Sequence, residues 1–332
     1  MNISKTGTRP LVSILIPCYN AERWVEQAIE SALAQTWPLK ELIVVDDGST
    51  DRSLKVIRRF EGLVQFETSP NRGANATRNR LLERAHGEWL QYLDADDYLL
   101  ASKIERHIEV LAAKPETDVI LGSVGWEHCS GGNVRQEFQK EPASRDPWVR
   151  VIKARFVETS GALWRRKAVE QSGGWKVDQP CCQEQELYMR MLEAGCEFTY
   201  CSHVGAMYRQ WGEQTVFNRN RREAHRRALE NYDRAENFLG AHGTLTRERL
   251  EAISQARFEA ARAIWQYDPT LAHQVIAKLQ KSHPNFTPSG EAAPAKYRIT
   301  YRLLGFGAAE KLAATRRTLL SHTHPKAVSS AT

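Results

Sequence analysis

Three aspartates, Asp94, Asp96 and Asp97, follow directly after the apolar segment Glu88–Leu93, which has the pattern of a buried strand. Because side chains alternate along a strand, Asp94 and Asp96 are expected on the same side of the strand end. Two carboxylates in this arrangement suit Mg²⁺ or Mn²⁺ bound to a diphosphate, with water and phosphate oxygens as the remaining ligands. Taken alone, the segment is at least as consistent with a surface turn, or with a helix cap formed by Asp97, as it is with a metal site.

A second acidic segment, Val45–Asp51, follows the predicted strand Glu41–Asp46. An aspartate in this segment can accept a hydrogen bond from a nucleobase N–H or from a ribose hydroxyl. Gly48 permits a tight turn here because glycine tolerates a positive φ. Ser49 or Asp51 can also cap the helix that follows, and this structural role is compatible with ligand binding.

Polar clusters elsewhere in the first third of the chain occupy similar positions. Cys18-Tyr19-Asn20 follows the first predicted strand, and Asn71-Arg72-Gly73 and Thr77-Arg78-Asn79 supply amides and cations for a diphosphate or a base. Taken singly, either arginine is expected to be a solvated helix residue. Open α/β sheets bind ligands at the carboxyl ends of their strands, so the clusters after the strands predict one site at that edge.

The elements that must position these residues alternate between strands and helices, which predicts an α/β fold with a mostly parallel sheet flanked by helices. The predicted strands are 11–17, 41–46, 63–68, 88–93 and 119–124, and the predicted helices are 21–36, 53–60, 74–85 and 102–113. Residues 128–146 are polar and irregular, which predicts a surface loop.

A second lobe follows, with the segments 159–164 and 173–175, a helix over 183–194 and a strand-like segment over 198–208. After Trp211 the chain becomes rich in Arg and Ala, and helices are expected over 219–239, 246–265 and 271–280, followed by a linker over 284–294. We therefore expect a main domain over residues 1–215, with a nucleotide-sugar half over about 11–105 and an acceptor half over about 106–215. Residues 216–332 are expected to form a basic helical region.

Composition narrows the classes of protein that are consistent with the chain. With 332 residues, 42% hydrophobic and 26% charged, it is typical of a globular protein. It lacks an apolar run of about 18 residues and an N-terminal signal peptide, so a cytoplasmic location is expected, with the six cysteines reduced. The net charge of +6 comes from residues 218–332, which hold 19 Lys and Arg against 10 Asp and Glu, and no nucleic-acid-binding motif accompanies it.

The ordered motifs together resemble the family 2 inverting glycosyltransferases of the GT-A fold. The resemblance spans about Leu11 to Trp211, and each motif is weak by itself, whereas their order is specific. The matching segments are VSILIPCYN (12–20), LIVVDDGSTD (42–51), NRGANATRN (71–79), YLDADD (92–97), SGGW (172–175) and QEQELYMRML (183–192).

The resemblance implies a role for most of the residues named above. The region of Pro17, Tyr19 and Asp47 would hold the nucleoside, with Asn20 and Asn71 beside it. Arg78 would support the base or the diphosphate, Asp94 would face the ribose, and Asp96 would ligate Mn²⁺ or Mg²⁺, with Asp94 as a second metal ligand. The implied donor is a UDP-sugar, although other nucleotides remain open.

The catalytic base that the resemblance implies stands in a pair of residues at the start of a helix. The family usually has Glu-Asp here, whereas this chain has Gln183-Glu184, so Glu184 takes the position of the base. A carboxylate suits this position because it takes a proton from the attacking acceptor hydroxyl. Glu186 is the alternative base, but on a helix it points about 200° away from Glu184 and is expected to cap or to pair with Arg190.

Two tryptophans are expected on the acceptor side. Trp211 stands where many relatives carry a His, and because Trp cannot ligate a metal, either Asp96 and the phosphates carry the metal alone or Trp211 stacks on sugar. Trp175 is a candidate platform for the acceptor, with core packing as the more frequent role of such a residue.

The predicted activity is therefore sugar transfer from a nucleotide-sugar to an acceptor hydroxyl, with polysaccharide or glycolipid assembly as the setting that the resemblance implies. The alternatives are a nucleotide-sugar-binding protein without catalysis and a sugar-phosphate nucleotidyltransferase. The latter is expected to carry a glycine-rich loop after its first strand, which this chain lacks. Residues 297–320 combine apolar and basic side chains, so they either contact an anionic membrane at its inner face or pack against the main domain.

Overall fold

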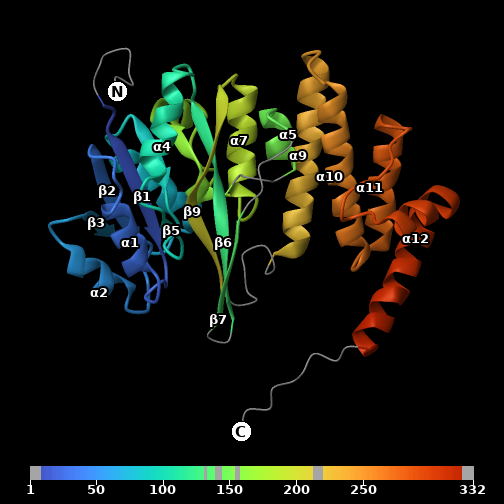
Figure 1. Ribbon diagram of the computed structural model, residues 1–332, viewed down its shortest axis with the longest axis horizontal. Coiled ribbons are helices and arrows are strands. Elements are labelled where there is room, and N and C mark those ends of the chain that lie inside the picture. The colour runs from blue at the N-terminus through green and yellow to red at the C-terminus, as the bar shows by residue number, and fades with distance from the viewer. Residues whose placement is uncertain (1–8, 131–132, 139–143, 154–157, 212–219, 324–332) are drawn as a thin grey trace, which may run out of the picture. The chain divides into compact units, whose positions relative to one another are not determined.

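The structure is a computed structural model that describes residues 9–130, 133–138, 144–153, 158–211 and 220–323 (Figure 1). The chain divides into two compact units, Met1–Ala224 and His225–Thr332. The boundary that we expected after residue 215 lies outside the described residues, so its position stays a prediction.

The first unit is built on one sheet that contains nine strands among the described residues, in the order β3-β2-β1-β4-β8-β6-β9-β5, with β7 paired to β6. The strands are β1 (Val12–Cys18), β2 (Lys40–Asp46), β3 (Gln65–Thr68), β4 (Trp89–Tyr92), β5 (Tyr98–Leu99), β6 (Val119–Ser130), β7 (Asn133–Phe138), β8 (Leu163–Arg165) and β9 (Phe198–Trp211).

Strands β1 to β4 form the parallel half of this sheet. Strand β1 reads as an apolar run and is almost wholly buried, as expected for a central strand covered on both faces. It pairs in parallel with β2 and with β4, and Cys18 lies opposite Asp46 in the register. The segments after these strands therefore leave the sheet at the same edge, which confirms the predicted gathering of the polar clusters.

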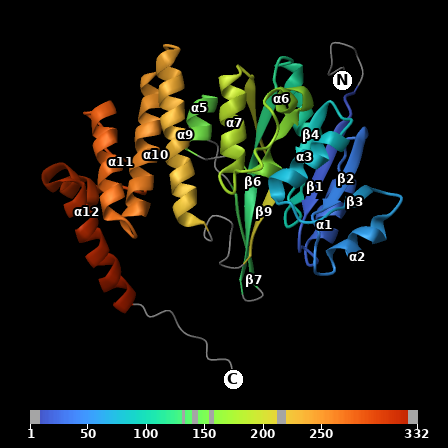
Figure 2. The same ribbon diagram turned by 180° about the vertical axis from the view of Figure 1, so that it is seen from behind.

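Helices cover both faces of the sheet. Helix α3 packs on β1 and β2 and is seen in front of the sheet in Figure 2. Helix α4 packs on β9 and is seen in front of the sheet from the opposite side, in Figure 1. The helices of this unit are α1 (Val25–Leu33), α2 (Ser53–Ile57), α3 (Ala74–Arg84), α4 (Lys103–Glu109), α5 (Pro147–Ile152), α6 (Arg166–Gln171) and α7 (Gln183–Glu193). The predicted α/β class with flanking helices is confirmed.

The second half of the sheet is mixed. Strand β8 is antiparallel to both of its neighbours, β5 is antiparallel to β9, and β6 is parallel to β9. The surface loop predicted over residues 128–146 is wrong in its first part, because β6 continues to Ser130 and pairs with β7 as an antiparallel hairpin. Every side chain of β7 is exposed, so this strand lacks the apolar alternation by which a sequence indicates a strand.

The second unit consists of helices. They are α9 (Arg221–Ala241), of which residues from His225 onward belong to this unit, α10 (Arg247–Trp265), α11 (Pro269–Ser282) and α12 (Ala295–Thr323). Phe258 on α10 is fully buried and contacts the rings of Tyr297, Tyr301 and Phe306 on α12. The predicted helical region is present, and α12 is interrupted at Gly305, whose φ of 78° is not helical.

All six cysteines lie among the described residues, and none of them is joined in a disulfide bond. Among the helices of the described residues, none is both long and apolar enough to cross a membrane.

Candidate donor and catalytic site

The loops after β1 and β2 are joined to each other by side chain–backbone hydrogen bonds. Asn20 accepts from the backbone N–H of Thr50 at 2.8 Å through its side-chain oxygen, and its own N–H donates to Ser49 Oγ at 2.9 Å. Asn20 is therefore occupied with ordering these loops. Tyr19, the residue before it, has an exposed ring that is available to a ligand, whereas Pro17 is half-buried at the end of β1.

Asp47 orders the loop that precedes α3. Its two carboxylate oxygens accept the backbone N–H groups of Arg72 and Gly73 at 2.8 and 2.9 Å, and the residue is buried. Gly48 has a φ of 72°, and a Cβ at this position would lie 2.8 Å from the backbone nitrogen of Asn71, so the predicted tight turn is confirmed. The segments after β2 and β3 are thus packed closely together, with Asn71 exposed beside them.

The acidic segment after β4 is a turn and not a continuation of the strand. Strand β4 ends at Tyr92, and the N–H of Asp97 donates to the carbonyl of Asp94 at 3.0 Å. Contrary to the prediction, Asp94 and Asp96 therefore do not continue the strand, and it is the turn that places them near each other. Asp97 does not cap a helix, because it is buried and accepts from Ser160 Oγ at 2.7 Å and from the backbone N–H of Arg209 at 2.9 Å.

The surroundings of the Asp96 carboxylate disfavour its negative charge. Burial and, next, the negative charge of Asp94 raise its pKa above the usual value, while a hydrogen bond from Trp211 acts in the opposite direction. Trp211 Nε1 donates to Asp96 Oδ2 at 3.0 Å, and its ring lies 6.1 Å from that of Trp24. Trp211 therefore contacts the proposed metal ligand directly, and with 43% of its surface exposed it keeps ring area for a ligand.

Arg209 holds the backbone of the acidic turn, a role that the sequence did not indicate. Its guanidinium donates to the carbonyl of Asp96 at 2.9 Å and to Glu127 at 3.0 Å. It lies between the rings of Trp24 and Tyr98, at 4.6 and 4.7 Å from their centroids. These partners lie directly before α1, in the acidic turn, on β5 and on β6, so a local sequence pattern could not reveal the contact.

Arg78 links the acidic turn to the start of α7. Only 6% of its side chain is exposed, and it donates to Asp94 Oδ1 at 2.8 Å and to Gln183 Oε1 at 2.6 Å. Its Nη2 also lies 3.8 Å from Glu184 Oε1. Burial acts to lower the pKa of Arg78, but the charges of Asp94 and Glu184 outweigh burial and raise it. Arg78 is thus the cation that both carboxylates share, and not a solvated helix residue.

Glu184 and Glu186 have separate environments, as the helical geometry predicted. Glu184 is partly exposed and accepts from Thr159 Oγ1 at 2.5 Å. The side chain of Glu186 is 5% exposed and is held by Arg190 at 2.8 Å and by Lys176 at 2.6 Å. Burial acts to raise the pKa of Glu186, but its hydrogen bonds to these two cations hold it below the usual value. Glu186 is therefore held in a buried ion pair, whereas Glu184 is partly exposed.

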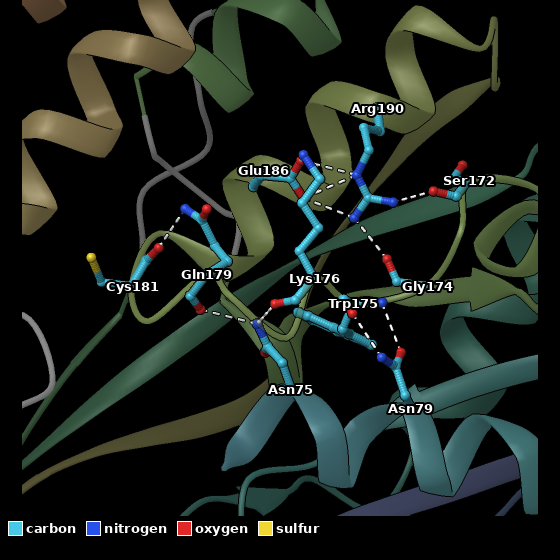
Figure 3. Close-up of polar contacts among 10 residues, drawn as sticks. All are labelled: Asn75, Asn79, Ser172, Gly174, Trp175, Lys176, Gln179, Cys181, Glu186 and Arg190. Atoms are coloured by element: carbon cyan, nitrogen blue, oxygen red, sulfur yellow. Dashed lines mark hydrogen bonds and ion pairs between the residues drawn. The ribbon is translucent and has the colours of Figure 1, made fainter. Parts of the chain in front are cut away.

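The Gly-Gly-Trp turn is held between α3 and α7 (Figure 3). Arg190 on α7 donates to the carbonyls of Ser172 and Gly174. On α3, the side chain of Asn79 donates to the carbonyl of Trp175 at 2.7 Å and accepts its N–H at 2.8 Å. Asn75, one turn earlier, donates to the carbonyls of residues 176 and 179 at 2.6 and 3.1 Å. Helix α3 thus anchors the whole connection that leads to Glu184.

Trp175 is a core residue, which corrects the prediction of an acceptor platform. It is 2% exposed, its ring lies 5.3 Å from Tyr92 in an edge-to-face arrangement, and the Arg78 guanidinium lies 4.8 Å from its centroid. A sugar cannot reach this ring in the structure. The reason is that the two glycines before Trp175 turn the chain inward, toward α3.

The acidic turn fits a divalent cation that is shared with another molecule. Asp94 and Asp96 supply hard carboxylate oxygens, and burial, followed by the negative charge of Asp94, raises the pKa of Asp96, which a bound cation would counteract. Among the described residues, no group of three or more His, Cys, Asp or Glu side chains is arranged to hold a metal ion. A cation here would need oxygens from elsewhere, and a diphosphate can supply them.

The chain is similar in sequence to several known proteins. Residues 13–173 match the family described as Glycosyl transferase family 2. The chain is 40% identical over 106 residues to an uncharacterized glycosyltransferase of Haemophilus influenzae, and 36% identical over 110 residues to the "Putative teichuronic acid biosynthesis glycosyltransferase TuaG" of Bacillus subtilis. These alignments cover 31% and 32% of this chain. They cover 42% and 44% of the two relatives, which is less than half of the length of each.

Among solved structures, the S. aureus TarS 1–349 complex with UDP-GlcNAc is similar, with a TM-score of 0.57 and 17% identity over 88% of this chain and 91% of that chain. At this identity the likeness shows the fold. Over residues 13–173 the chain matches the family 2 glycosyltransferases, and its fold is similar to the GT-A fold of TarS, with extra helices at the C-terminal end of this chain.

Proposed function

We propose that this protein transfers a sugar from a nucleotide-sugar, in the first instance a UDP-sugar, to an acceptor hydroxyl with inversion at the anomeric carbon. The observation that carries the proposal is the position of Arg78 between Asp94 on the donor side and Glu184 on the acceptor side. One buried cation holds both carboxylates at the same edge of the sheet, so a reacting sugar bound there would lie between them.

Glu184 is the proposed general base. In an inverting transfer, the acceptor hydroxyl attacks the anomeric carbon from the side opposite the leaving diphosphate, and a carboxylate accepts its proton as the new bond forms. Glu184 is partly exposed at the start of α7, which leaves it accessible to an acceptor, whereas Glu186 is engaged by two cations.

The nucleoside is proposed to lie against the loops after β1, β2 and β3. Tyr19 is exposed and can stack on a base, and Pro17 and Asn71 lie on the same edge of the sheet. Asn20 and Asp47 contribute mainly by ordering these loops, because their oxygens already accept backbone N–H groups.

We propose that Asp96 and Asp94 hold Mn²⁺ or Mg²⁺ together with the diphosphate. The cation would neutralise charge on the leaving diphosphate. This chain's own contribution is to hold the carboxylates: the Trp211 indole orients Asp96, Arg209 fixes its carbonyl and Arg78 orients Asp94.

Nucleotide binding provides the first test. The melting temperature of the full chain is measured with UDP, GDP, CDP and dTDP, each with and without Mn²⁺, on the native chain and on Asp96→Ala. We expect one nucleotide to raise it by several degrees with Mn²⁺, and Asp96→Ala to abolish the metal-dependent part. Glu116→Ala, which removes an exposed carboxylate elsewhere in the unit, should respond like the native chain. No shift with any nucleotide would contradict the proposed donor site.

The two alternative functions predict other outcomes. A protein that only binds a nucleotide-sugar would show the thermal shift but no transfer and no donor hydrolysis. A sugar-phosphate nucleotidyltransferase would release pyrophosphate from a nucleoside triphosphate, which the proposed transferase would not.

The acceptor is proposed to be a growing polysaccharide or a glycolipid, and the protein to act at the inner, cytoplasmic face of a membrane. Support comes from α12, where Ile299, Leu303 and Leu304 are 60%, 73% and 67% exposed. The exposed charges of Lys296, Arg298, Arg302 and Lys311 accompany them, and the sole acidic residue among 295–315, Glu310, is buried. Exposed leucines among cations fit an anionic lipid surface.

Cosedimentation with lipid vesicles tests this contact. The native chain should bind vesicles that contain phosphatidylglycerol, bind phosphatidylcholine vesicles weakly, and lose binding as salt increases. The double variant L303S/L304S should lose at least about tenfold in binding, because each buried Leu contributes roughly 1.5 kcal/mol or more. L63S, which changes a leucine that is 66% exposed in the first unit, should bind like the native chain. Equal binding by the double variant would exclude α12 as the contact.

A further inference from the structure

The short 3-10 turn Thr159–Gly161, here called the 159–161 turn, connects the proposed base to the acidic turn. Thr159 Oγ1 donates to Glu184 Oε1 at 2.5 Å. The next residue, Ser160, donates through its Oγ to Asp97 Oδ2 at 2.7 Å, and the other oxygen of Asp97 accepts the N–H of Arg209. Two adjacent hydroxyls thus contact the proposed base, Glu184, and the buried Asp97 of the acidic turn.

Buried side chains hold this turn in place. The carbonyl oxygen of Ser160 accepts from Gln91 Nε2 at 3.1 Å, and the carbonyl of Ala162 accepts from Lys103 Nζ at 2.8 Å. Between them, the carbonyl of Gly161 lies 3.1 Å from His107 Nε2. All three side chains are fully buried, and burial, as the largest cause, lowers the pKa of both Lys103 and His107 well below the usual values.

The carbonyls of Ser160 and Ala162 accept from buried donors, and the Gly161 carbonyl lies against the buried His107 ring, so the 159–161 turn is a rigid support. A hydroxyl on a rigid support restricts the side chain that it contacts, whereas a hydroxyl on a free loop would follow that side chain. The position of Thr159 Oγ1 therefore limits the orientations that the Glu184 carboxylate can adopt.

We propose that Thr159 is a positioning residue for Glu184, which holds Oε1 so that Oε2 remains to accept the proton of the acceptor hydroxyl. This proposal rests on the proposed role of Glu184 as the base. Within the described part of the chain, Glu184 Oε2 has no hydrogen-bond partner, and Arg78 Nη2 lies 3.8 Å from Oε1. Without the Thr159 hydroxyl, the carboxylate can rotate to pair directly with Arg78, and a carboxylate paired with an arginine is a weaker base.

Other ionisable groups also face Glu184 and are unaffected by a change at Thr159. They are Arg78 on α3, Tyr188 on the same helix and Tyr208 on β9. They stay in place in a Thr159 variant, so a change in the behaviour of Glu184 is attributable to the hydroxyl.

The test compares the native full chain with T159V, T159S and T36V. Valine has the shape of threonine but no hydroxyl, and serine restores the hydroxyl. T36V is the matched control, because Thr36 Oγ1 donates to Glu105 at 2.7 Å in the same kind of Thr–Glu bond far from Glu184 in the sequence. Three quantities are measured: stabilisation by the nucleotide with Mn²⁺, kcat and KM of transfer, and the rate at which a water-soluble carbodiimide labels Glu184, followed by peptide mass spectrometry.

For T159V we expect a loss of about tenfold or more in kcat, since positioned general bases contribute about 10²–10⁴-fold. The donor KM and the nucleotide-dependent stabilisation should stay within about twofold of the native values. Labelling of Glu184 should change severalfold, and T159S and T36V should resemble the native chain in all three measurements.

The proposal is overturned if T159V keeps the native kcat and labelling rate, or if T159S is as impaired as T159V. Labelling does not require turnover, so it separates this inference from the proposed function. A changed labelling rate in T159V, restored in T159S, with no transfer by any variant would support the contact and refute the transferase.

Discussion

Glu184→Gln is expected to lower kcat of sugar transfer by about 10²–10⁴-fold while nucleotide binding is retained. The reason is that Gln fills the same space and still accepts the hydrogen bond from Thr159, but cannot take a proton from the acceptor. Initial rates with a saturating donor give kcat, and melting temperatures with the nucleotide and Mn²⁺ report the donor site. The unfolding midpoint should change little, because Glu184 is partly exposed.

Glu186→Gln is the matched control, since it makes the same substitution two residues further along α7. Glu186 is buried and accepts from Arg190, which in turn holds the carbonyls of the Gly-Gly-Trp turn. We expect this variant to lose roughly 3 kcal/mol of unfolding free energy, because it breaks a buried ion pair, and to keep transfer in its folded fraction. If Glu186→Gln abolished kcat and Glu184→Gln did not, our assignment of the two carboxylates would be reversed.

Arg78→Ala is expected to have the largest effect on stability, with a loss of about 3–5 kcal/mol of unfolding free energy. The substitution removes the cation shared by Asp94 and Glu184 and leaves Gln183 Oε1 without the hydrogen bond that it accepts from Arg78. Chemical denaturation measures the free energy, and the thermal shift with the nucleotide should disappear because Asp94 loses its orientation.

Arg80→Ala is the control for Arg78→Ala, because Arg80 lies on the same helix and also pairs with two carboxylates. Its partners, Glu67 and Glu83, are at the surface with it, where solvent screens the interaction. The unfolding midpoint of Arg80→Ala should therefore stay near the native value. Equal midpoints for the two variants would mean that the buried ion pair does not stabilise the fold.

The regular part of the fold could be predicted because its signals are local. The apolar run over β1, followed by Cys18-Tyr19-Asn20, and the run over β2, followed by Asp47-Gly48, indicate a strand and a tight turn without reference to the rest of the chain. The positive φ of Gly48 and the parallel pairing of β1 with β2 and β4 confirmed these predictions. Strand β7 had no such signal, because all its side chains face solvent.

The candidate site was predicted less completely, because its contacts join residues that are far apart in the chain. Asp94, Asp96, Arg78 and Glu184 could be named from ordered motifs, and the structure brings Arg78 to both Asp94 and Glu184. Thr159 and Arg209 carry no motif of their own, although they contact Glu184 and the carbonyl of Asp96. Trp175 was placed on the acceptor side because burial cannot be read from a Gly-Gly-Trp pattern.

By itself, the sequence determined that strands and helices alternate, that acidic and amide side chains follow the strand ends, and that a carboxylate opens α7. These features depend on residues within a few positions of one another. Only the tertiary structure decided which of two glutamates is accessible, which tryptophan contacts Asp96, and which buried arginine joins the two carboxylates. Those outcomes depend on burial and on the packing of α3, α7 and the 159–161 turn. This packing joins side chains that are 25 positions apart for Thr159 and Glu184, 105 for Arg78 and Gln183, and 115 for Asp96 and Trp211.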